Sequence, residues 1–241
     1  MPTKRLLFLV VLIASTSTIS FAGLINPISA SVDLSMSSDA GCGSVSDSSS
    51  QAWGTPLNPL TAMTDALATC THPNRKVETS GKLTAKWNNA KSGTIKFKNI
   101  GWKVNNNVTS GAANANLGTD YSYTFSPNKD VWFDLSYDIS STGDLNGFGL
   151  NGFYVSLGTS FTALPINTSG DLLYFLNAGD TYTLSIVNGA NISGGIAGLT
   201  EYMDGTFKFK ATATTPEPSS LILLGGGVLG LAGTLRKKLR A

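Results

Sequence analysis

The residues of this chain best suited to metal or thiol chemistry are two cysteines and one histidine, namely Cys42, Cys70 and His72. A structural zinc site needs four ligands, and the two cysteines do not have the spacing of a paired-cysteine knuckle. In an oxidising compartment, an even number of cysteines favours a bridge over free thiols. We therefore predict a Cys42–Cys70 disulfide, no metal site, and a surface-loop position for His72.

Aspartates are the second group that could do chemistry. A glycosidase uses two carboxyl groups that flank the scissile bond, and five aspartates are candidates for such a pair: Asp134, Asp138, Asp144, Asp171 and Asp180. The sequence does not select two of them, and it contains no serine nucleophile elbow. We expect no enzymatic activity and keep a secreted hydrolase as the least favoured alternative.

Binding is the other chemistry that the residue types allow. Asp138, Asp144 and Asn146 could supply oxygen ligands to calcium, although their spacing does not match the twelve-residue calcium loop. We expect no cofactor and keep calcium as an alternative. Aromatic side chains could stack on sugar rings if they share an outer sheet face, and otherwise they belong to the core. The candidates are Trp87, Trp102, Trp132, Tyr121 and Tyr123.

Strands must position most of these residues, because hydrophobicity alternates with a period of two from residue 81 onward. Ile95 and Phe97 alternate with Lys96 and Lys98, and residues 131–139 place apolar and polar side chains on opposite faces. Further strands are expected at 121–126, 149–157, 172–176, 181–187 and 206–212. One apolar and one wet face are typical of antiparallel sheets. We predict an all-β fold, an antiparallel β-sandwich over 81–215, with a jelly roll as one topology.

The segment before residue 81 has a different composition. Residues 31–50 are rich in serine and glycine, which predicts an exposed, loop-like lead-in. Between Pro59 and Thr69, the residues Leu60, Met63 and Leu67 have helical spacing, which predicts one short helix. We therefore treat 23–80 as a lead-in to the sandwich, held by the predicted disulfide.

The N-terminus has the pattern of a secretory signal peptide. Lys4 and Arg5 precede an apolar run, and small residues end at Ala22, where a signal peptidase would cut. Nine apolar residues are too few to span a bilayer comfortably. The expected signal peptide is therefore 1–22.

The C-terminus has three parts in order within residues 216–241. Pro216, Glu217 and Pro218 come first, an uncharged apolar stretch follows from 219 to 235, and the basic residues Arg236, Lys237, Lys238 and Arg240 come last. The apolar stretch is near the short end of what crosses a bilayer as a helix, and the basic end should stay cytoplasmic. Prolines exclude the tripeptide from the helix and leave Glu217 in an extended, protease-accessible segment.

This C-terminus resembles the PEP-CTERM sorting signal of Gram-negative bacteria. The resemblance covers about a tenth of the chain and implies recognition by an exosortase, a membrane-embedded cysteine protease, during export to an envelope rich in exopolysaccharide. The implied route crosses the inner membrane, leaves the protein transiently anchored there, and ends in the outer envelope or outside the cell. A plain membrane anchor is the alternative.

The net charge of the part of the chain between the two targeting segments argues against a nucleic acid as partner. Between Gly23 and Thr215 the chain has 11 lysines and arginines against 14 aspartates and glutamates, a formal net charge of −3, which is not the footprint of a nucleic-acid-binding domain. The favoured function is a non-enzymatic surface or extracellular-matrix protein associated with exopolysaccharide or biofilm. The main alternative is a carbohydrate-binding module or adhesin. Both have exosortase and signal peptidase as partners during export.

Overall fold

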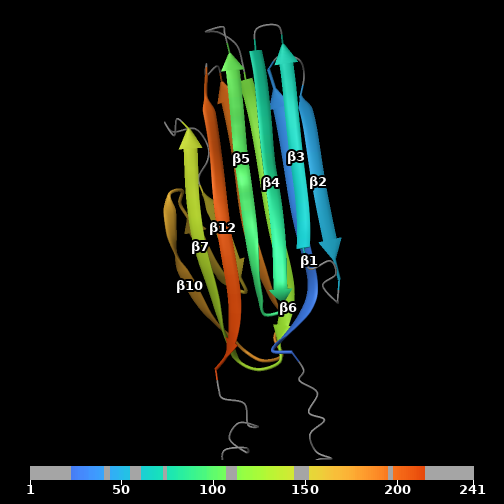
Figure 1. Cartoon of the computed structure of the whole chain (residues 1–241), viewed down its shortest axis with the longest axis vertical. Coiled ribbons are helices and arrows are strands. Elements are labelled where there is room, and N and C mark those ends of the chain that lie inside the picture. Colours follow the sequence, from blue (N-terminus) through green and yellow to red (C-terminus); the bar gives the residue numbers. More distant parts are fainter. Residues whose placement is uncertain are drawn as a thin grey trace, which may run out of the picture.

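The computed structural model describes residues 23–40, 44–54, 61–72, 75–106, 113–143, 152–194 and 198–214. These residues form twelve strands (Figure 1), all paired antiparallel and arranged in two sheets. The predicted antiparallel β-sandwich is confirmed. Within these ranges no helix is long and apolar enough to cross a membrane, and the helix predicted at 219–235 lies outside them.

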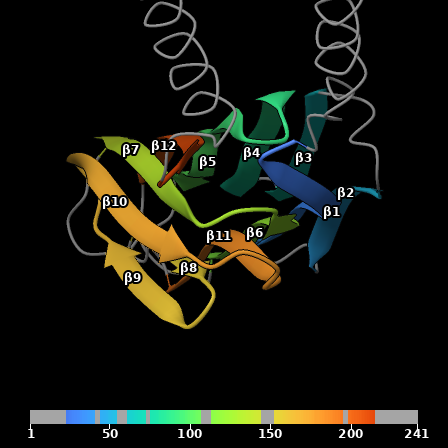
Figure 2. The ribbon, with the colours of Figure 1, turned by 90° about the horizontal axis from the view of Figure 1, so that it is seen from below.

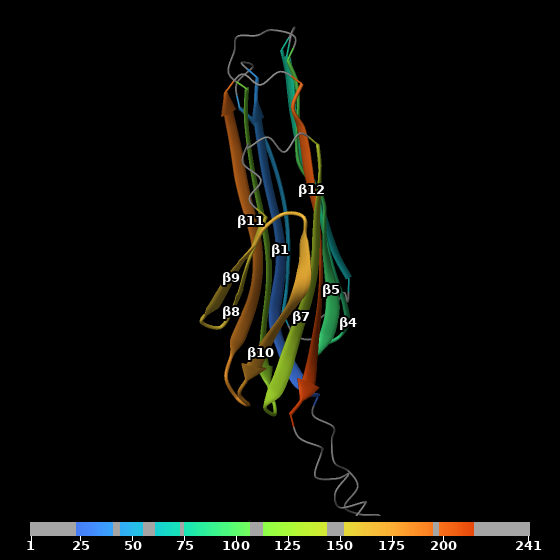
Figure 3. The same ribbon diagram turned by 90° about the vertical axis from the view of Figure 1, so that its left-hand side faces the viewer.

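The two sheets have six strands each. Sheet A has the order β2 (Val45–Trp53), β1 (Ile25–Asp39), β6 (Ala113–Pro127), β11 (Tyr182–Gly194), β8 (Phe153–Leu157) and β9 (Ser160–Leu164). Sheet B has the order β10 (Thr168–Leu176), β7 (Val131–Gly143), β12 (Thr200–Ala213), β5 (Ser92–Asn106), β4 (Arg75–Asn89) and β3 (Thr61–His72). Figure 3 shows the two layers side by side, with β10 leaving the β8–β9 hairpin to join sheet B.

The core is the single apolar layer between the sheets. Strand β7 has the predicted alternation: Val131, Phe133 and Leu135 are buried while the residues between them face outward. Rings from both sheets interdigitate, because Phe133 stacks between Phe125 of β6 and Phe209 of β12 with centroid separations of 5.3 and 5.7 Å. Pairs of this kind add to the free energy gained by burying the rings.

A β-bulge in β5 shifts which residues face the core. Ile95 and Phe97 point inward, but after the bulge the inward residues are Ile100 and Trp102. Asn99 has a φ of 50°, a left-handed conformation that asparagine tolerates better than most residues. Its backbone N–H donates to Asp204 Oδ1 at 2.7 Å. The bulge therefore leaves Lys96 and Lys98 outward and keeps the later part of β5 in the core.

Two expectations for the N-terminal part of the chain are wrong. The loop-like segment expected at 31–50 contains most of β1 and part of β2, with Val32, Leu34 and Met36 buried between outward residues. Serine at the outward positions conceals this alternation, because serine is not a typical strand former. The expected boundary at residue 81 lies inside β4, so the lead-in is part of the sandwich.

The helix expected between residues 59 and 69 is also wrong, because residues 61–72 form β3. Met63 and Leu67 are four residues apart, a spacing that places two side chains on one face of a strand as well as of a helix. Both are exposed, at 51% and 55%, while Ala66 and Ala68 face the core. Small residues at the inward positions removed the apolar period of two that identifies most strands.

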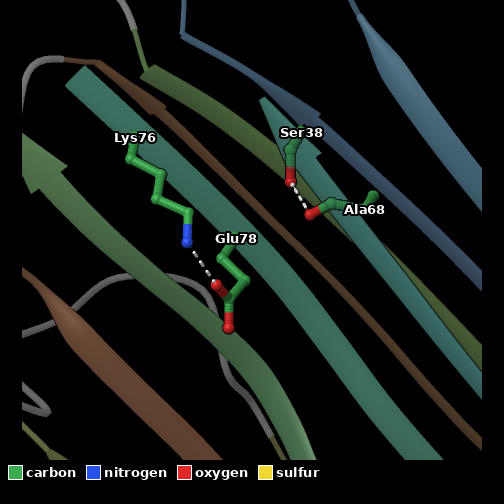
Figure 4. A network of polar contacts seen from close by, with 4 residues as sticks. All are labelled: Ser38, Ala68, Lys76 and Glu78. Atoms are coloured by element: carbon green, nitrogen blue, oxygen red, sulfur yellow. Dashed lines mark hydrogen bonds and ion pairs between the residues drawn. The ribbon is translucent and has the colours of Figure 1, made fainter. Parts of the chain in front are cut away.

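Polar contacts join the sheets along the side where β2 and β3 are the edge strands. The Ser38 hydroxyl of β1 donates to the Ala68 carbonyl of β3 at 2.9 Å (Figure 4) and lies 2.7 Å from the Thr79 hydroxyl of β4. Nearer the surface, the Leu67 N–H donates to Asp47 Oδ2 of β2 at 2.8 Å. Satisfying an edge N–H in this way protects β3 from pairing with another chain.

The domain begins and ends at the same pole, which we call the lower pole. The Asn128 N–H donates to the Leu24 carbonyl at 3.1 Å, and the Thr214 N–H donates to the Asp130 carbonyl at 3.2 Å. The turn between β6 and β7 therefore contacts both ends of the described chain. Figure 2 views this pole from below, with the start of β1 and the end of β12 facing the viewer.

The assignment of β3 and β4 gives a stability test with matched substitutions. Leu83→Ala removes a side chain that is 0% exposed and should lower the free energy of unfolding by about 2–5 kcal/mol. Leu67→Ala, on the neighbouring strand, removes the same atoms from the surface and should cost less than about 1 kcal/mol. Urea denaturation measures both values. A comparable loss in the two variants would contradict the strand assignment of residues 61–72.

Candidate functional site

Several residues singled out by the sequence lie outside the described residues. They are Ala22 of the signal-peptidase site, the Pro216–Glu217–Pro218 signal, the basic end at Arg236, Lys237, Lys238 and Arg240, and Cys42. Cys70 is described and is fully buried, and its Sγ accepts a hydrogen bond from the Ala40 N–H at 3.0 Å. Because Ala40 is two residues from Cys42, this position is compatible with the Cys42–Cys70 disulfide, which stays a prediction.

Of the four candidate catalytic aspartates that the structure describes, Asp138 and Asp171 line one open hollow, and Asp134 and Asp180 are not part of it. Asp134 and Asp138 of β7 and Asp171 of β10 are on the outer face of sheet B. Asp180 lies in the turn before β11, where its Oδ2 accepts a hydrogen bond from the Tyr182 hydroxyl at 3.3 Å. Asp144 and Asn146 are outside the described residues. His72 is the last residue of β3.

Four of the five aromatic candidates for sugar stacking are core residues, which is the alternative that the sequence left open for them. Trp87, Trp102, Tyr121 and Tyr123 are at most 1% exposed. They point inward because alternate residues of a strand share one face, and these four share the face of the other buried apolar residues in their strands. The remaining candidate, Trp132, is 43% exposed and lies on the polar side of β7, as its strand neighbours indicated.

Trp132 forms an exposed aromatic pair with Phe175 of β10. The two residues are cross-strand partners, their ring centroids are 5.2 Å apart, and the rings meet edge to face at 70°. Phe175 is 48% exposed, and Leu173 beside it is 63% exposed. The pair lies near the lower pole on the outer face of sheet B. Aromatic rings held in this way can pack against the apolar face of a ligand.

Lysines occupy the middle of the same outer face. Six of them project from three adjacent strands and are all exposed, and we call this set the lysine belt: Lys82 and Lys86 of β4, Lys96 and Lys98 of β5, and Lys208 and Lys210 of β12. Hydroxyl side chains alternate with them, since Thr94 lies between Lys208 and Lys86, and Lys96 lies between Thr206 and Thr84.

No ion pair within the described residues reaches a belt lysine, although Asp65 and Asp134 are the cross-strand partners of Lys82 and Lys210. Among the described residues the single ion pair joins Lys76 and Glu78 at 3.0 Å (Figure 4), outside the belt. Lys82 and Lys98 are direct cross-strand partners, an arrangement of like charges that destabilises a sheet. Next to the belt, Lys208, Asp138 and Asp171 line a shallow polar hollow of about 390 Å³.

The outer face of sheet A has the opposite character. None of its six strands contains a lysine or an arginine, and Asp33 and Asp120 are direct cross-strand partners. Partial burial raises the pKa of the Asp120 carboxyl, and the nearby Asp33 charge raises it further. The described residues contain no group of three or more metal-binding side chains, so this pair carries no metal assignment.

The lysine belt was not predicted from the sequence, although part of its signal is visible there. Lys96 and Lys98 were assigned to the wet face of a strand, and Lys208 and Lys210 have the same spacing of two. What the sequence does not contain is the pairing that places residues 82–86, 96–98 and 208–210 side by side. That information comes from the registers of β4 with β5 and of β5 with β12.

Comparison with known proteins bears on the C-terminus. The family model of the PEP-CTERM protein-sorting motif matches residues 214–237, which confirms the resemblance inferred from the Pro-Glu-Pro sequence, the apolar stretch and the basic end. The motif implies an exported protein that is processed by an exosortase. The match begins at the residue after β12, so the sorting motif directly follows the folded domain. No curated protein matches the chain.

The aspartate pair on sheet A gives a pH-dependent test. Because the folded protein raises the pKa of Asp120, ionising this group costs stability as the pH rises through that pKa. Asp120→Asn should therefore raise the melting temperature at about pH 7, and the gain should shrink in acid as Asp120 becomes protonated. Asp33→Asn should also raise the melting temperature at about pH 7, because it removes the charge opposite Asp120, and the double variant should gain less than the sum of the two. A gain independent of pH would contradict the repulsion.

Proposed function

We propose that this protein is a non-enzymatic component of the bacterial surface or extracellular matrix, delivered by an exosortase and associated with exopolysaccharide. The observation that carries the proposal is the sorting motif at residues 214–237, directly after the last strand. A short connection of this kind presents a folded domain for release at the membrane, with no long stalk between the two.

Processing at the motif would leave the domain intact. The buried hydrophobic residues of the described chain extend from Ile25 to Ala211, and all of them precede the motif. The lower pole holds both ends of the domain, so cleavage after Ala22 and at the Pro-Glu-Pro segment would occur on the same side of the molecule. Neither cleavage would remove a strand from either sheet.

The proposed route follows from the two ends of the chain. Signal peptidase would release the N-terminus outside the inner membrane of a Gram-negative cell, while the apolar stretch at 219–235 would hold the C-terminus in that membrane. The basic residues from Arg236 onward would stay cytoplasmic. Exosortase action near Glu217 would then transfer the domain to the outer envelope or the exterior.

Processing can be tested in strains with and without an exosortase. We expect intact mass to show loss of the residues after about Pro216 only in the exosortase-positive strain, with the domain moving from the membrane to the surface or medium. The variant Pro216→Ala/Glu217→Ala/Pro218→Ala should keep its tail in both strains. Glu78→Ala, which changes a half-buried glutamate of β4, is the control outside the motif and should be processed normally. An intact membrane-bound tail in every strain would refute sorting.

A carbohydrate-binding module is the second candidate, and the exposed pair of Trp132 and Phe175 favours it. An edge-to-face aromatic pair on a sheet surface offers an apolar platform bordered by polar side chains, here Asp134 and Thr212. Sugar rings have an apolar face and a polar rim, so they fit such a platform. The candidate needs no enzymatic group.

Glycan arrays test this second candidate. If the protein binds a neutral glycan, Trp132→Ala should weaken the affinity by about tenfold or more, as expected for a central aromatic contact. Phe161→Ala is the matched control, because Phe161 is 67% exposed on the other sheet and its loss should leave the affinity unchanged. Repeating the binding measurement with EDTA tests whether glycan binding requires calcium. Binding that survives Trp132→Ala would exclude this platform as the site.

A further inference from the structure

Positive charge is strongly segregated in this domain despite the net charge of −3. Eight of the ten lysines within the described ranges lie on the outer face of sheet B, and none lies on a strand of sheet A. The eight are Lys76, Lys82, Lys86, Lys96, Lys98, Lys103, Lys208 and Lys210. Six of them form the lysine belt. Scattered lysines would be enough for solubility, so folding alone does not account for this arrangement.

One pair of like charges within the belt opposes folding. Lys82 and Lys98 face each other across β4 and β5, and no ion pair within the described residues involves any belt lysine. Lysines held close together repel one another, and a bound anion would relieve that repulsion while forming charge-assisted hydrogen bonds. The arrangement is therefore better adapted to a complex with an anion than to the isolated domain.

We propose that the lysine belt binds an anionic polysaccharide chain through its carboxylate groups. This deepens the proposed function, on which it rests for the presence of exopolysaccharide around the protein. The ammonium groups would pair with the carboxylates, and the hydroxyls of Thr84, Thr94 and Thr206 between them would accept and donate hydrogen bonds to sugar hydroxyls. A polymer needs no deep pocket, because many weak contacts along an open surface add together.

The shape of the belt favours a polysaccharide over a nucleic acid. The belt covers three adjacent strands, so its outermost strands are about 10 Å apart, and a single polymer chain could lie along it. Carboxylates flank it, since Asp134 of β7 pairs with Lys210 in register and Asp65 of β3 pairs with Lys82. A wider and more densely charged duplex would approach these carboxylates and be repelled. The aromatic pair on the same face adds a surface for sugar rings.

The test uses the full chain purified in a neutral detergent, with polygalacturonate, dextran and double-stranded DNA as immobilised ligands. We expect retention on polygalacturonate, none on dextran, and weaker retention on DNA. If all six lysines take part, the affinity should fall by roughly 300-fold between about 0.05 and 0.2 M salt, by analogy with lysine contacts to single-stranded polyanions.

Matched variants locate the site. Lys208→Gln/Lys210→Gln removes two charges from the belt and should weaken binding to polygalacturonate by about tenfold at low salt, with a smaller salt dependence. Lys91→Gln/Lys129→Gln removes two charges from turns at the lower pole and should bind like the unchanged protein. Thermal melts establish that both variants are folded. The single substitution Lys96→Gln removes a charge from β5, the middle strand of the belt, and tests whether this lysine also contributes to binding.

Each outcome decides the proposal. No retention on polygalacturonate, equal losses in the two double variants, or tighter binding to DNA would overturn it. Weaker retention of Lys208→Gln/Lys210→Gln alone would support it. The proposed function is tested by a separate measurement. The intact mass and the cell fraction of the protein show whether the tail is processed, and this result does not depend on whether the belt binds. A processed protein that does not bind polygalacturonate would leave sorting in place and remove only the belt assignment.

Discussion

Every feature of this domain depends on the burial of alternate side chains from long strands in one layer between two sheets. Four strands, β1, β4, β5 and β6, have fifteen residues each, and a register slip of one residue would turn all their buried side chains to the surface. The bulge at Asn99 is the place where the inward phase of β5 changes. Once alternate residues are buried, the residues between them face outward, and their types determine the composition of both outer faces.

Sequence predicted the sandwich and several strands because the alternation is clear where large apolar residues mark the inward face. Val131, Phe133 and Leu135 are the clearest example. It failed at β3, where the inward Ala66 and Ala68 are small and the exposed Met63 and Leu67 suggested a helix. It also failed at β1, where outward serines imitated a loop. In both strands, residues with a low intrinsic preference for β structure are held in place by pairing with neighbouring strands. This is a tertiary effect, which local propensity does not include.

The candidate site was less predictable than the fold. The exposed position of Trp132 could be inferred from the polar residues on its strand face, and it is the aromatic candidate that reaches the surface. Its partner Phe175 and the lysine belt depend on strand pairing. Lys86 and Lys208 are more than a hundred residues apart in the chain, yet only Thr94 separates them across the sheet. Charge counts over the whole domain conceal such a face, because the aspartates elsewhere cancel its lysines.

The position of β12 has a mechanical consequence. This strand is the last of the domain, it leads directly into the sorting motif, and it is hydrogen-bonded along its length to β5 on one side and to β7 on the other. A pull on the tail therefore acts along the strand and loads two ladders of hydrogen bonds in shear, so that many bonds resist together. An edge strand at this position would instead peel away from the sheet one bond at a time. While the tail is held at the membrane, tension from a polymer gripping the domain would pass to a central strand and leave the fold intact.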